Sequence, residues 1–469
     1  MNNASGVAAS DDAACLGQPK GLAFLAFTEL WERFSYYGMG SLVVLYMVQE
    51  LLLPGHIEHV AGMAAARGAL ENRFGPLSPQ ALASMLFGLY GGLVYLTPII
   101  GGWLADRWFG AKRMVLTGVI LMTFGHAAMI FEESFLLALL LLILGSGALK
   151  GNIAAQVGQL YPLDDESRRA RGFTIFSAFI NIGAFAGPLV CGLLAQIWGW
   201  HYGFGFAGVL MLIACAVYLA GGKYLPDEGP RAQEQTEQVK LTPRECRTLL
   251  LMLPVLIVVI FGHVAYFQSV NVGLVWTSQH VALDTTMGMI PAPWFTSIDP
   301  LSGIVFAPLL ILWWRAQARR QTEPGDIGKI GIGMVLLAFS MGFFAIGALF
   351  AGTGKTSPIW PVMAYMAAGI GFLWYWPITL AFVSQRAPQS INSMVIGTTY
   401  LTLFVASLIA GYLGSLYEKL GPVSFFLLNA AVPATGGLLI LIFGAALKRA
   451  INRPDPVIAP SPKTIGVTA

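Results

Sequence analysis

The sequence predicts an all-α polytopic membrane protein with twelve transmembrane helices in two six-helix bundles. Of its 469 residues, 56% are hydrophobic and only 11% are charged, and the mean hydropathy is +0.69. These values are typical of a membrane protein and not of a soluble one. Apolar runs of about twenty residues, the length that spans a bilayer, recur along the chain. One polar segment divides the runs into two equal groups.

The polar segment 223–247 is rich in charge and proline, which predicts a cytoplasmic linker, and it is too short to hold an extra pair of helices between the halves. We therefore expect a cytoplasmic tail over 1–21, an N-terminal bundle over 22–222, a C-terminal bundle over 248–447 and a second cytoplasmic tail over 448–469. The predicted spans are 22–50, 80–105, 113–132, 135–160, 172–197, 202–222, 248–278, 296–318, 328–352, 358–383, 391–416 and 422–447.

The basic residues predict the orientation of these spans, because Lys and Arg accumulate in cytoplasmic loops. With the N-terminus inside, most of the 27 Lys and Arg residues fall in cytoplasmic segments. Those that fall outside are Arg67, Arg73, Lys355 and Lys419. Residues 1–20 lack the basic start and short apolar core of a cleavable signal, so we expect the first run to remain as a spanning helix. Both termini are predicted to be cytoplasmic, in a plasma membrane or bacterial inner membrane.

The first apolar run contains three charged side chains, Glu29, Glu32 and Arg33, within the stretch FTELWERFSYYG. A charged side chain at the centre of a membrane helix costs about 2.5–3.5 kcal/mol on insertion scales. On a helix, these residues and Tyr36 fall on one face, at positions i, i+3, i+4 and i+7. We predict that this face meets charged partners or a water-filled path.

Other classes of function find little support in the sequence. A net charge of +3 does not indicate nucleic-acid binding. No nucleophile with a matching base is apparent, so we expect no enzymatic activity and no cofactor. The histidines His56 and His59 are three residues apart in the first outer loop, but no further ligand is fixed nearby in sequence, so a solvated loop is favoured over a metal site. The cysteines show no metal-ligand spacing and are expected to be packing residues: Cys15, Cys191, Cys215 and Cys246.

The loop after the second run reads GGWLADRWFGAKR, from Gly101 to Arg113. It resembles the acidic, basic and glycine-containing loop of the major facilitator superfamily. The alternative is an ordinary positive loop with a tight glycine turn. Two six-helix halves joined by a cytoplasmic linker favour the superfamily fold, in which one bundle rocks against the other around a site at the membrane midplane.

The first-run motif is similar to the ExxER motif, followed by paired tyrosines, of the proton-coupled oligopeptide transporters. Further blocks resemble this family in the same order, at Leu89–Gly110, Ala148–Tyr161 and Phe173–Gly208. The resemblance is strong over 22–222 and weaker in the C-terminal half. It implies a proton-driven symporter that imports small peptides or peptide-like carboxylates by alternating access. The expected partners are the substrate, protons and the lipid bilayer, and the protein is expected to be a monomer that does not bind nucleic acid.

The resemblance also implies roles for individual residues. Glu29, Glu32, Arg33 and Lys150 are expected to couple proton binding to the conformational cycle, because a carboxylate's affinity for a proton depends on which cation lies beside it. Arg33 and Lys150 can also receive a substrate carboxylate. The remaining residues expected at the substrate site are Tyr36, Tyr37, Tyr95, Asn181, Gln268, Asp299, Phe372, Trp374 and Tyr375.

The C-terminal half departs from the family pattern. Phe372 occupies the position of the tenth-helix glutamate that receives the peptide amino group, and Phe267 replaces the seventh-helix glutamate. Asp299 occupies the position of an eighth-helix asparagine, and Thr399 that of an eleventh-helix tryptophan. In one interpretation Asp299 has become the partner of Lys150 or of a substrate ammonium. In the other, which the aromatic block at Phe372 favours slightly, the site takes a non-peptide or N-blocked organic acid.

Two further interpretations remain for the charged cluster. It could be a static ion-pair network that only holds the first and fourth helices together. The chain could also be a membrane receptor that keeps the fold without transport. The presence of all four charged residues argues against a receptor, because a receptor has no need of a proton path.

Overall fold

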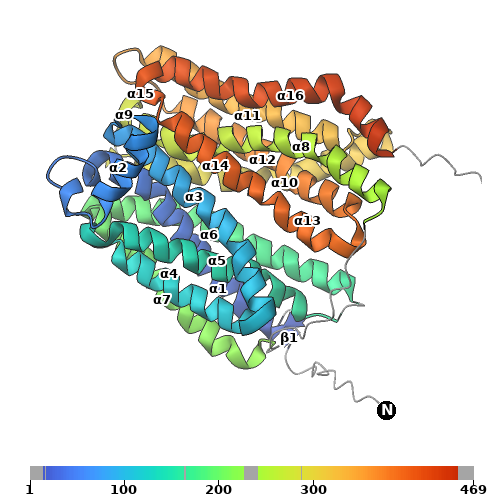
Figure 1. The fold of residues 1–469 in the computed structure, drawn as a ribbon. Coiled ribbons are helices and arrows are strands. Elements are labelled where there is room, and N and C mark those ends of the chain that lie inside the picture. Colours follow the sequence, from blue (N-terminus) through green and yellow to red (C-terminus); the bar gives the residue numbers. More distant parts are fainter. Residues whose placement is uncertain (1–13, 16, 163–164, 227–240, 287, 453–469) are drawn as a thin grey trace, which may run out of the picture.

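The computed structural model describes residues 14–15, 17–162, 165–226, 241–286 and 288–452, and within these ranges the long helices form two bundles (Figure 1). The all-α, two-bundle prediction is confirmed, while most of the linker and both tails lie outside the described residues. The N-terminal bundle contains α1 (Lys20–Tyr46), α3 (Pro79–Leu104), α4 (Ala111–Ala128), α5 (Phe135–Gln159), α6 (Glu166–Trp198) and α7 (Trp200–Gly221). The C-terminal bundle contains α8 (Pro243–Gln268), α10 (Ile298–Arg319), α11 (Asp326–Ala351), α12 (Ile359–Arg386), α13 (Asn392–Thr399) with α14 (Leu401–Gly414), and α16 (Pro422–Asn452).

Shorter elements connect the long helices. Two small antiparallel hairpins pair β1 (Ala14–Cys15) with β2 (Gln18–Pro19) and β3 (Asp284–Thr285) with β4 (Gly288–Met289). The short helices are α2 (Met63–Phe74), α9 (Leu274–His280) and α15 (Tyr417–Leu420). Wider π-helical turns extend three of the long helices, at Met47–Leu51, Ala105–Phe109 and Ser269–Gly273. Single 3₁₀ turns lie at Ile57–His59, Glu132–Ser134, Gly222–Tyr224, Ala292–Ser297 and Gln389–Ile391.

The helix ends follow local capping chemistry. α8 begins at Pro243, before the predicted position 248, because Thr242 and Glu245 form a reciprocal capping box. By length and composition, ten helical stretches within the described ranges are apolar enough to cross a membrane. α1 and α4 are not among these ten: α1 carries Glu29, Glu32 and Arg33, and α4 is short and begins with two basic residues.

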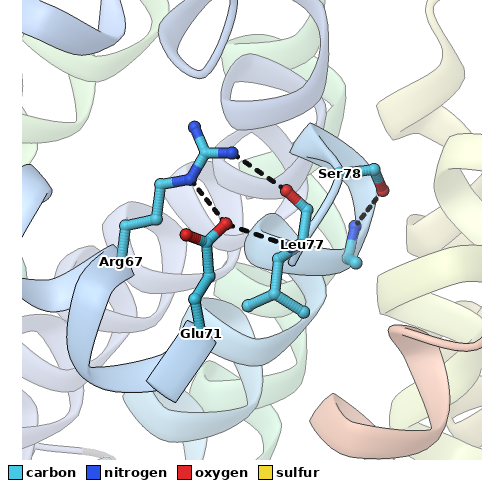
Figure 2. Close-up of polar contacts among 5 residues, drawn as sticks. Arg67, Glu71, Leu77 and Ser78 are labelled. Carbon is cyan, nitrogen blue, oxygen red and sulfur yellow. Dashed lines mark hydrogen bonds and ion pairs between the residues drawn. The ribbon is translucent and has the colours of Figure 1, made fainter. Parts of the chain in front are cut away.

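The connection between α1 and α3 is ordered by one ion pair (Figure 2). Arg67 Nε donates to Glu71 Oε1 at 2.9 Å, and the Leu77 amide donates to the same oxygen at 3.1 Å. Ser78 then caps α3 by accepting from the Ala81 amide at 3.2 Å. The hydrogen bonds from Arg67 and Leu77 hold the pKa of Glu71 below its ordinary value. The carboxylate thereby fixes where the chain turns into α3.

The two bundles are joined at one end of the molecule, which carries α2, α9 and α15 and lies opposite the chain termini (Figure 1). We call it the α2 end, and the other the terminal end. The inter-bundle hydrogen bonds of the described residues gather at the α2 end. They include Gln49 Nε2 to Ser278 Oγ (3.1 Å), Ser84 Oγ to Asn271 Oδ1 (3.2 Å), Trp294 Nε1 to Leu189 O (2.8 Å) and Ser297 Oγ to Phe185 O (2.8 Å).

A glycine pair brings the backbones of the two bundles together at the α2 end. Gly88 on α3 faces Gly411 on α14, and Ser407 Oγ donates to Gly88 O at 2.9 Å. A Cβ added at Gly88 would lie 2.6 Å from Gly411 Cα and 2.7 Å from Ser407 O. Both are fixed backbone atoms, so the helices can approach this closely only because neither position has a side chain.

We expect Gly88→Ala to shift the protein toward a conformation in which the bundles separate at the α2 end. An overpacked contact costs about 1–3 kcal/mol, which changes the ratio of two states by roughly five- to 150-fold. The measurement is electron–electron double resonance between spin labels at the exposed positions Asn72 and Lys419 in a cysteine-free background. Gly102→Ala is the control, because a Cβ there meets nothing within 4 Å. Equal distance distributions in both variants would contradict the prediction.

Candidate functional site

Arg33 joins the two acidic residues of α1 in a buried cluster. Its Nε lies 2.7 Å from Glu29 Oε1 and 2.7 Å from Glu32 Oε2. The contact with Glu29 has hydrogen-bond geometry, whereas both oxygens of Glu32 are buried and have no hydrogen-bond partner within the described residues. Glu32 is fully buried, so its carboxylate depends on the nearby cations for compensation, and Arg33 is the one in direct contact. Helical spacing brings these side chains together, as the sequence predicted.

Lys150 lies beside this cluster, on α5, but contacts aromatic rings. Its Nζ is 4.2 Å from the ring centroid of Tyr36 and 5.5 Å from that of Tyr95. Such positions over a ring face attract a cation. Across the described ranges, Lys150 forms no ion pair with a carboxylate. In this conformation the guanidinium holds both acids, and the ammonium of Lys150 is available to another anion.

The cluster borders a cavity of about 540 Å³ between the two bundles. This volume falls in the range of small-molecule sites, about 300–1,000 Å³. Glu29, Arg33 and Lys150 supply its charged wall. The other side of the cavity is aromatic and apolar, formed by residues of the C-terminal bundle: Tyr266, Phe372, Trp376, Tyr400 and Leu403.

A second, smaller cavity of about 110 Å³ lies further along α1, toward the α2 end, where Ser41 lines it. Tyr36, Tyr37, Tyr95 and Tyr266 line both cavities and therefore lie between them. Tyrosines offer flat apolar faces together with hydroxyl groups. The three tyrosines that the sequence placed at the site are thus at the boundary between the two chambers.

Asp299 is the acidic residue that the C-terminal bundle contributes to these cavities. It lies in the first turn of α10 and lines the smaller chamber, where its Oδ2 accepts a hydrogen bond of 2.5 Å from the Tyr266 hydroxyl. A Cβ at Gly369 would be 2.8 Å from Asp299 Oδ1, so the glycine allows α12 to pass close to the carboxylate. No cation pairs with Asp299 among the residues described.

Phe372 and Trp376 present one face of α12 to the larger cavity. They are four residues apart, which places them on the same side of a helix. The Phe372 ring packs against Tyr266, with centroids 5.2 Å apart. The position at which the family resemblance implies a glutamate is therefore an apolar wall, adjacent to the tyrosine that holds Asp299.

Two aromatic residues predicted at the site lie elsewhere. Trp374 packs against Trp313 and Trp314, with centroids 5.6 and 5.2 Å away. Tyr375 is buried inside the C-terminal bundle, and its hydroxyl lies 2.7 Å from His263 Nδ1. Successive helical residues point about 100° apart, so Trp374, two residues from both Phe372 and Trp376, lies on the opposite side of α12. Tyr375 instead turns toward His263 on α8. In this conformation Trp374 and Tyr375, which the sequence placed at the substrate site, are not among the residues that line the two cavities.

Two polar residues predicted at the site also lie outside both cavities. Gln268 is fully buried, and its Nε2 donates to Ala410 O at 2.8 Å, so it joins α8 to α14. Asn181 is exposed on α6, whereas Ile180 is the neighbouring residue that lines the larger cavity. Tyr266 and Tyr400 were missed, because nothing local in the sequence shows that these tyrosines face the bundle interface. Tyr266 directly precedes Phe267, which stands at the position of the family's seventh-helix glutamate.

A family model described as the Major Facilitator Superfamily matches residues 25–411. The di-/tripeptide transporter of Lactococcus lactis subsp. lactis (strain IL1403) is 29% identical over 91% of this chain and 95% of its own. The peptide transporter YePEPT of Yersinia enterocolitica subsp. palearctica serotype O:3 (strain YE-P4) is 28% identical over 93% of this chain and 96% of its own.

Solved structures are similar over the same length. The crystal structure of peptide transporter POT in complex with sulfate has a TM-score of 0.83 at 26% identity, covering 94% of this chain and 98% of that chain. A mutant peptide transporter POT in complex with alafosfalin has a TM-score of 0.82 at 26% identity, covering 94% and 97%.

Proposed function

The chain belongs to the Major Facilitator Superfamily, and we propose that it is a proton-coupled symporter that imports small peptides or peptide-like carboxylates by alternating access. The observation that carries this proposal is the buried Glu29, Glu32 and Arg33 cluster at the wall of a central cavity, in a chain similar to peptide transporters over nearly its full length. The protein is a multi-pass membrane transporter, and both termini lie in the cytoplasm of the cell that carries it. The α2 end is then the outer end, and this conformation is closed on the outside.

Proton coupling follows from the sharing of Arg33. Arg33 lies between Glu29 and Glu32, so the two carboxylates compete for one cation. Lys150 pairs with neither of them and lies over the Tyr36 ring. A substrate carboxylate that binds Lys150 or Arg33 changes this competition. Proton binding and substrate binding are thereby linked, because each alters the charge that the other group experiences.

A peptide has charges at both of its ends, and the cavities offer a partner for each. Arg33 and Lys150 receive the carboxylate from the N-terminal bundle, and Asp299 receives the ammonium from the C-terminal bundle. Tyr36, Tyr37, Tyr95 and Tyr266 surround the path between them. Asp299 and the similarity to di-/tripeptide transporters favour peptides over the alternative of a non-peptide or N-blocked acid.

Purified protein in liposomes with an inward proton gradient should accumulate dipeptides. Because an N-acetyl group removes the charge that Asp299 pairs with, N-acetylated dipeptides should compete poorly for this uptake. The measurement is uptake of a labelled dipeptide, with a protonophore as the control for coupling. Uptake that prefers N-blocked acids to free peptides would support the alternative substrate class.

Replacement of Glu32 by Gln should abolish gradient-driven uptake while substrate counterflow continues. The amide keeps the volume of the side chain but cannot exchange a proton, so only the coupled step is lost. Glu418→Gln, at an exposed position on α15, is the matched control and should retain both activities. Loss of counterflow together with driven uptake would instead indicate the static ion-pair role.

Asp299→Asn should raise the KM for dipeptides by roughly ten- to 100-fold, since a hydrogen bond to a charged group contributes about 1.5–3 kcal/mol. Inhibition by N-acetylated dipeptides should change little. Asp284→Asn, at an exposed position outside both cavities, is the control and should keep the wild-type KM. An Asp299→Asn variant with an unchanged KM for dipeptides would remove this residue from the site.

A further inference from the structure

Four side chains that can bind a metal converge at the α2 end of the N-terminal bundle, away from the cavities. Glu50 lies in the π-helical turn that ends the first span, and His56 lies in the loop after it. Glu132 begins the turn between α4 and α5, and His201 is in the first turn of α7. Because the four come from separate segments, their spacing in sequence gives no sign of the cluster.

The distances within the cluster resemble those of a metal site. One oxygen of Glu50, one of Glu132 and a ring nitrogen of His201 all lie within 4.8 Å of one another. His201 Nε2 is 3.8 Å from Glu50 Oε1, too far for a hydrogen bond. Two ligand atoms at ~2.0–2.2 Å from a tetrahedral zinc ion lie roughly 3.4 Å apart. A small cation between these groups therefore requires only a slight movement of either side chain.

His56 lies beside this set of three and reaches it through Glu132. Its Nδ1 lies 2.8 Å from Glu132 Oε1, within hydrogen-bond distance. If a metal ion replaced the proton that these two atoms share, both atoms would become ligands. All four side chains are partly exposed, between 17% for Glu132 and 43% for His56, so the cluster is accessible from solvent.

The residues around His201 fix the orientation of its ring. The His201 ring packs edge-on against Tyr46, with centroids 5.9 Å apart, and Tyr46 is fully buried. His201 Nδ1 is buried and has no hydrogen-bond partner among the described residues, whereas Nε2 faces Glu50. A cation on Nε2 would leave the proton on Nδ1 and so fix the tautomer of the ring.

We propose that Glu50, Glu132, His201 and His56 form a binding site for a divalent transition-metal cation of the Zn²⁺ class. Two imidazoles and two carboxylates are suited to zinc and similar ions, whereas calcium and magnesium prefer oxygen ligands alone. The two carboxylates neutralise the charge of the cation when both histidines are neutral. The site joins the outer end of the first span to the α4–α5 turn and to α7, all within one bundle.

The test uses the full-length protein in lipid nanodiscs, with any polyhistidine tag removed, and ZnCl₂ titrated against a chromophoric chelator. The wild type should bind one Zn²⁺ per chain at pH 7.5, and binding should weaken at pH 5.5 because protons compete for the histidines. His201→Ala and Glu132→Gln should each lower the affinity by about tenfold or more, as loss of a metal-site residue typically does. X-ray absorption of the bound zinc should show nitrogen and oxygen neighbours that include imidazole.

His59→Ala is the matched control, because His59 is an exposed histidine in the same turn region. Its amide donates to the His56 carbonyl at 3.0 Å, a backbone contact that alanine keeps. It should bind zinc as the wild type does. Retained proton-driven uptake shows that each variant is folded, since none of the four residues lies at the transport site. The proposal would be overturned if the wild type bound zinc no more tightly than the double variant Glu132→Gln/His201→Ala. It would also be overturned if His59→Ala lost as much zinc affinity as the ligand variants.

Discussion

The ion pairs of Arg33 with Glu29 and Glu32 are the interaction on which the arrangement of the transport site depends. Three charges in an apolar helix are tolerated only when they compensate one another, and the two contacts of 2.7 Å provide that compensation. When both carboxylates are deprotonated, the cluster carries two negative charges and one positive charge and attracts a further cation. Lys150 is the nearby candidate, and its position over Tyr36 keeps it close without committing it to either acid.

The charges around the cavities are divided between the two bundles. The cations that can bind a carboxylate, Arg33 and Lys150, belong to the N-terminal bundle, and Asp299 belongs to the C-terminal bundle. A zwitterionic substrate therefore bridges the bundles when it is bound end to end. Bridging gives the substrate different interaction energies in the open and closed arrangements, which is the condition for a ligand to shift a conformational equilibrium.

The sequence predicts those features that depend on local pattern. The apolar runs located the long helices, and the spacing of Glu29 and Arg33 placed them on one face. Features that depend on packing between distant helices could not be predicted. The Tyr266 and Asp299 pair requires α8 and α10 to be neighbours, and the inward placement of Trp374 depends on the rotation of α12 against α10. α2 escaped prediction because only Met63 of its residues is buried, so no apolar periodicity marks it.

α1 connects the charged cluster to the α2 end, where the two bundles are joined. Glu32 lies near its middle, and Gln49, in the π-helical turn that continues it, makes a hydrogen bond to Ser278 in the other bundle. At a rise of about 1.5 Å per residue, these two positions are roughly 25 Å apart along one continuous helical rod. If Arg33 changes the carboxylate with which it pairs and α1 tilts as a result, the displacement is largest at the far end of the helix, where Gln49 contacts Ser278. Glu50, next to Gln49, is a ligand of the proposed metal site, so a cation bound there would restrain the same end of α1.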